Sequence, residues 1–145
     1  MTRYGYTNNS KSDEWTKYYS EKNRLKKLAN EYQNKCNLNK KDIELCDDLK
    51  EEAKAIIDDL TYVSESLSSV DTAISYGGLI INGKSALAGK VSDKISNAES
   101  VSAELENFIT AVEQEKTTLQ QEYDLNYRIY GQYDFQYRNL RPPKP

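Results

Sequence analysis

Apolar side chains recur at three- and four-residue intervals along two long stretches of the chain. The first stretch runs from Ile43 to Ile74 and the second from Val91 to Tyr127. This spacing places the apolar residues on one side of an α-helix. Intervals that average near 3.5 residues favour the packing of each seam into a neighbouring helix. The pattern therefore predicts two long helices, each with one buried seam.

The seams carry the residues that we expect to pair with another helix, within the chain or in a partner. All of them are large aliphatic or aromatic residues at the repeating positions: Ile43, Leu49, Ile56, Leu60, Val63, Leu67, Val101, Leu105, Phe108 and Val112. Asp and Glu fill the positions between them on the first stretch. That acidic flank is expected to face solvent or a basic partner.

Helix-compatible sequence stops in the middle of the chain. Three of the six glycines, Gly77, Gly78 and Gly83, lie in this interval, and glycine favours turns over helix interiors. Residues 77–89 are therefore predicted to connect the two helices. The three aliphatic residues at positions 79–81 are read in two ways, as a plug that caps the hairpin end or as a docking point for a partner.

The ends of the helices are less sharply marked. Residues 1–12 are predicted to be a flexible leader, because Ser10 or Ser12 can cap a helix that begins near residue 13. Asn39 could act as a second cap, so the first helix either kinks at residues 37–41 or runs straight through.

The last sixteen residues, 130–145, are predicted to form an aromatic and proline-rich tail. Tyrosines and arginines alternate there and suggest a protein-facing surface, since both residue types dominate interface hot spots. The fold class is accordingly all-α. An elongated, antiparallel helical hairpin over residues 13–129 is expected.

Composition supports helices without a thick core: 37% of the 145 residues are hydrophobic and 30% are charged. The net charge of −3 is unevenly distributed, with a basic excess over residues 11–41 and an acidic excess over residues 42–71. A basic arm beside an acidic segment is compatible with nucleic-acid binding. The basic residues alternate with acids and no nucleic-acid-binding motif accompanies them, so no nucleic-acid partner is predicted.

No catalytic or cofactor site is predicted. The chain has no His, and Cys36 and Cys46 would lie about 15 Å apart on one helix, too far for a disulfide. Residues 78–85 match the phosphate-loop pattern G-x-x-x-x-G-K-[ST]. That pattern requires a preceding buried strand, whereas a long acidic helix precedes it here, so the match is read as coincidence. We expect a non-enzyme without metal or cofactor.

No apolar run is long enough to predict a signal peptide or a membrane span. The sequence predicts a cytoplasmic chain, or one that is exported by a route that does not read a cleavable signal.

The connector also carries a family resemblance. The run Tyr76-Gly77-Gly78-Leu79-Ile80-Ile81-Asn82-Gly83-Lys84, the following Gly89-Lys90-Val91 and the helix through Lys116 resemble the YwqH-like family. These are small helical proteins of Firmicutes encoded beside LXG toxins of type VII secretion. The resemblance implies a WXG-like hairpin that binds the LXG domain of a toxin and helps direct its export. It further implies a second small helical protein as a candidate partner and transient contact with the secretion machinery.

WXG-type pairs carry a Tyr-x-x-x-Asp/Glu export signal after the second helix. Tyr130 and Asp134 match it and make a candidate signal, although Gly131 between them weakens a helical presentation. The Trp-x-Gly turn of that group is missing. The competing hypothesis is a structural, homo-oligomeric coiled coil, which would need a strict heptad without the glycine connector.

Overall fold

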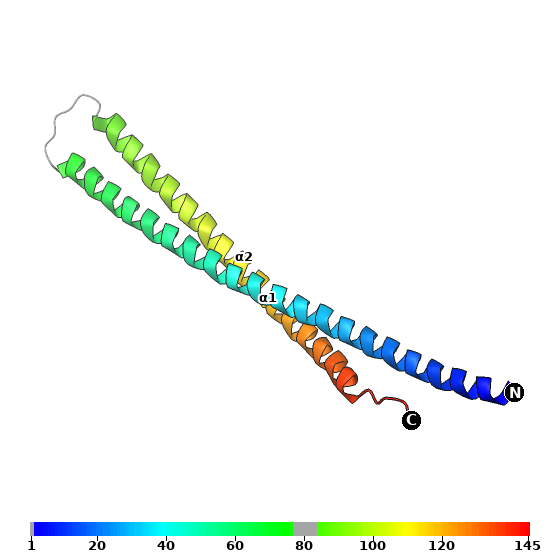
Figure 1. Ribbon diagram of the computed structural model, residues 1–145. Helices are drawn as coiled ribbons and strands as arrows, with labels where there is room; N and C mark the ends of the chain where they lie inside the picture. Colours follow the sequence, from blue (N-terminus) through cyan, green and yellow to red (C-terminus); the bar gives the residue numbers. More distant parts are fainter. Residues whose placement is uncertain (1, 77–83) are drawn as a thin grey trace. The chain divides into compact units, whose positions relative to one another are not determined.

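The computed structural model describes the backbone of residues 2–76 and 84–145, and the side chains of residues 11–73 and 87–145. Two helices make up these ranges, α1 (Thr2–Tyr76) and α2 (Lys84–Asn139) (Figure 1). No strand occurs in either range. The helices pack antiparallel, and the prediction of an all-α antiparallel hairpin is confirmed.

The chain divides into two compact units, each of which contains part of both helices. Unit 1 comprises Met1–Ile43 and Thr118–Pro145, and unit 2 comprises Glu44–Thr117. In unit 1, Asn39 contacts Asn126 and Tyr32 contacts Tyr133. In unit 2, Asp47 pairs with Lys116 and Lys50 with Glu113. In both units the residue number rises on one helix as it falls on the other, as antiparallel packing requires.

Most of the buried and half-buried positions follow a heptad on both helices. From Tyr18 to Asp71 on α1, and from Ala88 to Tyr137 on α2, every position in a series with alternating intervals of three and four residues is buried or half-buried. Five further half-buried residues lie beside this series: Glu21, Leu28, Asp47, Ile129 and Asp134. We label the seven positions a to g, with a and d on the seam. Position a includes Lys50 on α1 and Lys116 on α2. This register locates every other side chain relative to the seam.

The seam is packed by small residues against large ones. Its fully buried side chains include many of modest size: Leu25, Ala29, Cys36 and Leu119 in unit 1, and Cys46, Ala53, Val91, Ala98 and Val112 in unit 2. In unit 1 the seam of α2 contains half-buried tyrosines, among them Tyr123, Tyr130 and Tyr133, whereas the seam of α1 contains the smaller Ala29 and Cys36. Alternation of large and small residues across a helix pair keeps the seam filled.

Three predicted boundaries were wrong. α1 begins at Thr2, so the predicted leader over residues 1–12 is helical from residue 2 onward. α2 begins at Lys84, so residues 84–89 of the predicted connector are helical. α2 continues to Asn139, through most of the predicted tail over residues 130–145. A residue of low helix propensity or a competing cap changes helix stability by only about 1 kcal/mol. The packing of seam residues such as Ala88 and Tyr133 outweighs that amount.

Helix α1 is also unbroken across residues 37–41, where the sequence allowed either a kink or a straight helix. Asn39 is not a cap. Its side chain is 8% exposed and bonds across to α2, so tertiary contacts hold this residue in the helix interior. The aliphatic run at positions 79–81, with Gly77, Gly78 and Gly83, lies outside the described residues.

Candidate partner-binding surface

Of the nine large apolar side chains that the structure describes as exposed in unit 2, seven share one heptad position. On α1 they are Leu49, Ile56, Val63 and Val70, with exposed fractions of 36–47%. On α2 they are Leu87, Val101 and Phe108, with exposed fractions of 42–44%. All seven occupy position g, directly before an a residue of the seam. The other two, Leu45 at position c and Tyr62 at position f, lie outside this row.

The e rows of both helices share one side of unit 2. An open hollow of about 540 Å³ is lined by Thr61 and Ser68 from α1 and by Glu99 and Glu106 from α2, which all occupy position e. In each cross-helix ion pair the acidic partner, Asp47 or Glu113, is also an e residue. Because e and g flank the seam on opposite sides, the two g rows lie together on the other side.

We call this second side the g face, formed by the seven exposed apolar residues at position g in unit 2. With a fully exposed large apolar residue presenting roughly 200 Å², exposed fractions of 36–47% leave about 600 Å² of surface on them in total. The largest apolar patch on a typical monomer is roughly 300–600 Å² and is often functional. Unit 2 is therefore polar on its e side and apolar on its g side.

The structure separates the sequence-predicted seam into two groups. Ile43, Leu60, Leu67, Leu105 and Val112 are buried or half-buried between α1 and α2. Leu49, Ile56, Val63, Val101 and Phe108 are exposed and belong to the g face. Each helix has one buried seam at positions a and d, and the second group lies beside it because position g neighbours d and also satisfies a three- and four-residue spacing. Of the predicted set, only the second group remains available to a partner.

Two lysines at seam position a reach across the helix pair to carboxylates. Lys50 Nζ lies 2.7 Å from Glu113 Oε1, and Lys116 Nζ lies 2.6 Å from Asp47 Oδ1. The hydrogen bond from Lys50 lowers the pKa of Glu113, and the same bond raises the pKa of Lys50. The two pairs are reciprocal, each running from position a of one helix to position e of the other. A slip of the helices by one turn would break both, so they fix the register of unit 2.

Unit 1 contains a polar contact in the same seam. Asn126 Nδ2 donates to Asn39 Oδ1 at 2.9 Å, and Asn39 Nδ2 donates to Glu122 Oε2 at 3.4 Å. Asn39 is buried, and both asparagines occupy position d. A polar residue at a core position of a coiled coil typically specifies register at some cost in stability. Sequence reasoning missed this role and that of the two lysines, although a polar residue at the apolar spacing is a readable signal.

The candidate export signal lies on the last turns of α2. Tyr130 is half-buried at seam position a and lines a small hollow with Cys36 and Tyr123. Asp134 is half-buried, and its Oδ2 forms an ion pair with Arg138 Nε at 3.0 Å. The helix runs through Gly131 to Asn139. Tyr130 and Asp134 therefore both lie on a helix, with Tyr130 turned toward α1.

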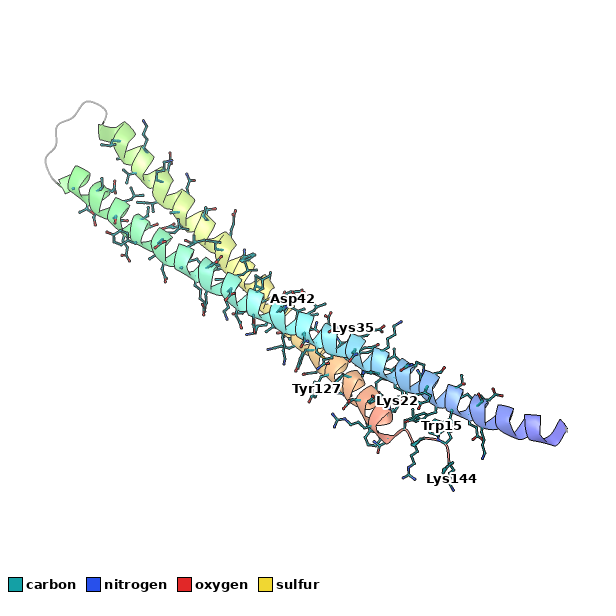
Figure 2. The ribbon with its side chains drawn as sticks, viewed as in Figure 1. Trp15, Lys22, Lys35, Asp42, Tyr127 and Lys144 are labelled. Atoms are coloured by element: carbon teal, nitrogen blue, oxygen red, sulfur yellow. The ribbon has the colours of Figure 1, made fainter. Side chains whose placement is uncertain are left out.

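Aromatic and basic side chains gather in unit 1 from both helices (Figure 2). Lys22 Nζ lies 5.9 Å from the ring centroid of Tyr137, and Lys40 Nζ lies 5.4 Å from that of Tyr123. These distances suit cation–π attraction, worth about 0.5–1 kcal/mol each at exposed sites. The contacts cross from α1 to α2, so they support the fold of unit 1.

The two cysteines are buried and are not joined in a disulfide. Burial raises the pKa of Cys36, and the nearby Lys40 offsets part of that rise. Within the described residues, no group of three or more Cys, Asp or Glu side chains is placed to hold a metal ion. Neither helix, over those same residues, contains a segment long and apolar enough to cross a membrane.

Comparisons with known proteins add no relative to this description. No family model, no curated protein and no solved structure matches the chain.

Proposed function

We propose that this chain is a non-catalytic binding partner that uses the g face of unit 2 to receive a helix of another protein. The observation that carries the proposal is the heptad row of seven exposed apolar residues on one side of a helix pair. A two-helix hairpin covers only one side of each helix. A third or fourth helix on the g face would complete a bundle of the kind in which such rows are buried.

The resemblance of the glycine connector to the YwqH-like family names a candidate partner. On that resemblance, the chain binds the helical LXG domain of a type VII secretion toxin and helps direct it to export. A second small helical protein could occupy further surface, and contact with the secretion machinery would be transient. The functional assignment thus combines a physical surface, the g face, with a family likeness in residues 76–116.

Binding in this mode needs no reaction chemistry. The charged side chains on the described seam of unit 2 include Lys50 and Lys116 at position a. Each forms an ion pair with a carboxylate of the other helix. The long row of exposed aliphatic side chains favours recognition by shape and apolar area, as in other helix-in-groove complexes.

The test is co-expression with an LXG-domain protein, followed by purification of the complex. A stable complex in fixed stoichiometry is the expected result. If the two proteins separate during purification, the targeting-partner function is refuted.

A second candidate function, a structural homo-oligomeric coiled coil, is favoured by the heptad that runs along both helices. Such a protein would form a heat-stable oligomer without any partner. Sedimentation of the purified chain distinguishes the two candidates, since only the second predicts a stable oligomer in the absence of a partner.

A further inference from the structure

The charge of the two units differs in sign. Unit 2 contains fifteen acidic and six basic residues, whereas unit 1 contains fourteen basic and eight acidic residues. The g face belongs to the acidic unit. Whatever helix covers it must therefore approach a surface with a strong negative field.

The acidic residues also border the g face itself. Glu52 and Asp59 occupy position c on α1, beside the g row, and Glu104 occupies position c on α2. Glu115 occupies position g of α2, in line with the apolar row. All four carboxylates are exposed, and none forms a hydrogen bond or an ion pair with another residue that the structure describes.

The register places apolar pairs at the centre of this border. The ion pairs Lys50–Glu113 and Lys116–Asp47 show that each step forward on α1 is a step back on α2. Ile56 therefore lies near the level of Phe108, and Val63 near the level of Val101. At the ends of the row, Leu49 lies near the level of Glu115, and Val70 near that of Lys94.

We infer that the occupant of the g face is an amphipathic helix whose apolar stripe is flanked by Lys or Arg. The stripe covers the central pairs, and the basic flanks reach Glu52 and Asp59 on one edge and Glu104 and Glu115 on the other. Lys94, at the far end of the row, calls for one acidic residue near that end of the occupant. The inference rests on the proposed function, because it specifies the chemistry of the helix that the proposal invokes.

The length of the occupant helix follows from the length of the g row on α1. Leu49 and Val70 are 21 residues apart on α1, which is about 32 Å at 1.5 Å per residue. An occupant helix of about six turns would span the face.

A second copy of the chain fits this surface less well than a basic helix does. Two g faces in contact would bring two acidic units together, with Asp59 and Glu104 of each copy near the same residues of the other if the apolar centres are aligned. Like charges placed across an interface oppose association. The exposed apolar row therefore favours a different, basic-flanked partner.

The experiment uses the full chain and two synthetic helical peptides of about 28 residues, long enough for the six turns. Both peptides carry the same Leu and Ile stripe, with Lys and Arg flanks in one and Glu flanks in the other. Fluorescence anisotropy at low and high salt measures binding. We expect the basic peptide to bind at least tenfold more tightly than the acidic one, and its advantage to shrink at high salt.

Matched variants locate the binding. Glu52→Lys with Asp59→Lys should weaken the basic peptide at least fivefold, whereas Glu51→Lys with Asp58→Lys makes the same change of net charge at position b, away from the g face, and should weaken it less than twofold. Ile56→Glu with Phe108→Glu should abolish binding, and Tyr62→Glu at position f should not. Circular dichroism confirms that each variant is helical.

Three results would overturn the inference: equal binding of the two peptides, equal effects of the two lysine pairs, or a stable homodimer that Ile56→Glu with Phe108→Glu disrupts. The first two results would leave the proposed function standing, because complex formation with the LXG domain tests it separately. A homodimer through the g face would also count against the proposed function.

Discussion

The buried contact between Asn39 and Asn126 provides a quantitative test of how the hairpin is specified. Asn39→Ala and Asn126→Ala each remove the 2.9 Å hydrogen bond that crosses from α2 to α1 in unit 1. The 3.4 Å bond from Asn39 to Glu122 is at the limit of hydrogen-bond length and contributes less. The pairing of the two amides is therefore the main interaction that the substitutions destroy.

The magnitude follows from burial. Asn39 is 8% exposed, so water does not readily replace the lost partner. A net hydrogen bond contributes about 0.5–1.5 kcal/mol, and a buried polar group left without a partner costs about 1–3 kcal/mol. Each single alanine variant should lower the free energy of unfolding by roughly 1–3 kcal/mol. The double variant should show a coupling free energy of about 1 kcal/mol between the two positions.

Urea unfolding followed by circular dichroism measures these values, with the exposed Asn30→Ala as a control that stays within about 0.5 kcal/mol of the parent. Replacement of both asparagines by Leu should raise stability and relax register, because a polar core residue specifies pairing at a cost. A coupling free energy below about 0.3 kcal/mol would refute the argument, since the two side chains would then act independently.

Four further predictions follow from particular contacts. The bond to Lys50 lowers the pKa of Glu113, so the ion pair stabilises unit 2 above the ordinary Glu pKa, and this stabilisation is lost as the pH falls below about 4. The same bond raises the pKa of Lys50, so the stabilisation is also lost above about pH 10.4. Thermal melts of the parent and Glu113→Gln should thus differ at pH 7 and converge at pH 3. Gly131→Ala, where an added methyl meets no atom within 4 Å, should raise the free energy of unfolding by about 0.5–1 kcal/mol in the same urea assay; a loss of stability would show that the helix does not run through this residue. The buried thiols of Cys36 and Cys46 should react with a thiol reagent only as fast as the protein opens, so addition of urea below the unfolding midpoint should accelerate the reaction, and an immediate reaction in buffer would contradict their burial. Tyr130→Ala with Asp134→Ala should reduce export of the toxin without loss of the toxin complex, and unchanged export would remove the signal assignment.

The sequence allowed the fold class to be predicted because periodicity is a property of many residues at once. Apolar residues recur at intervals of three and four from Ile43 to Ile74, and this repeated pattern outweighs any single unfavourable position. The boundaries could not be predicted, because Ser10, Gly89 and Gly131 are individual signals worth about 1 kcal/mol or less. The helices run past all three.

The candidate surface was only half visible in the sequence. Positions a, d and g all satisfy a spacing of three or four, so Leu49 and Ile56 appeared equivalent to Leu60 and Leu67. Only the partner helix decides which rows are covered, and that requires the register set by Lys50, Lys116 and Asn39. Reasoning about single helices passes over the two lysines and reads Asn39 as a possible cap, because it does not place these residues opposite a charged or amide partner.

The most direct test of the central claim asks which side of unit 2 touches the toxin. A photo-crosslinking amino acid is placed at position 63, on the g face, or at position 62, where Tyr62 is 72% exposed at position f. The chain is then irradiated in cells that also produce the LXG toxin. The account predicts a toxin adduct from position 63 and none from position 62. Adducts of equal yield from both positions, or an adduct only with a second copy of the chain, would contradict it.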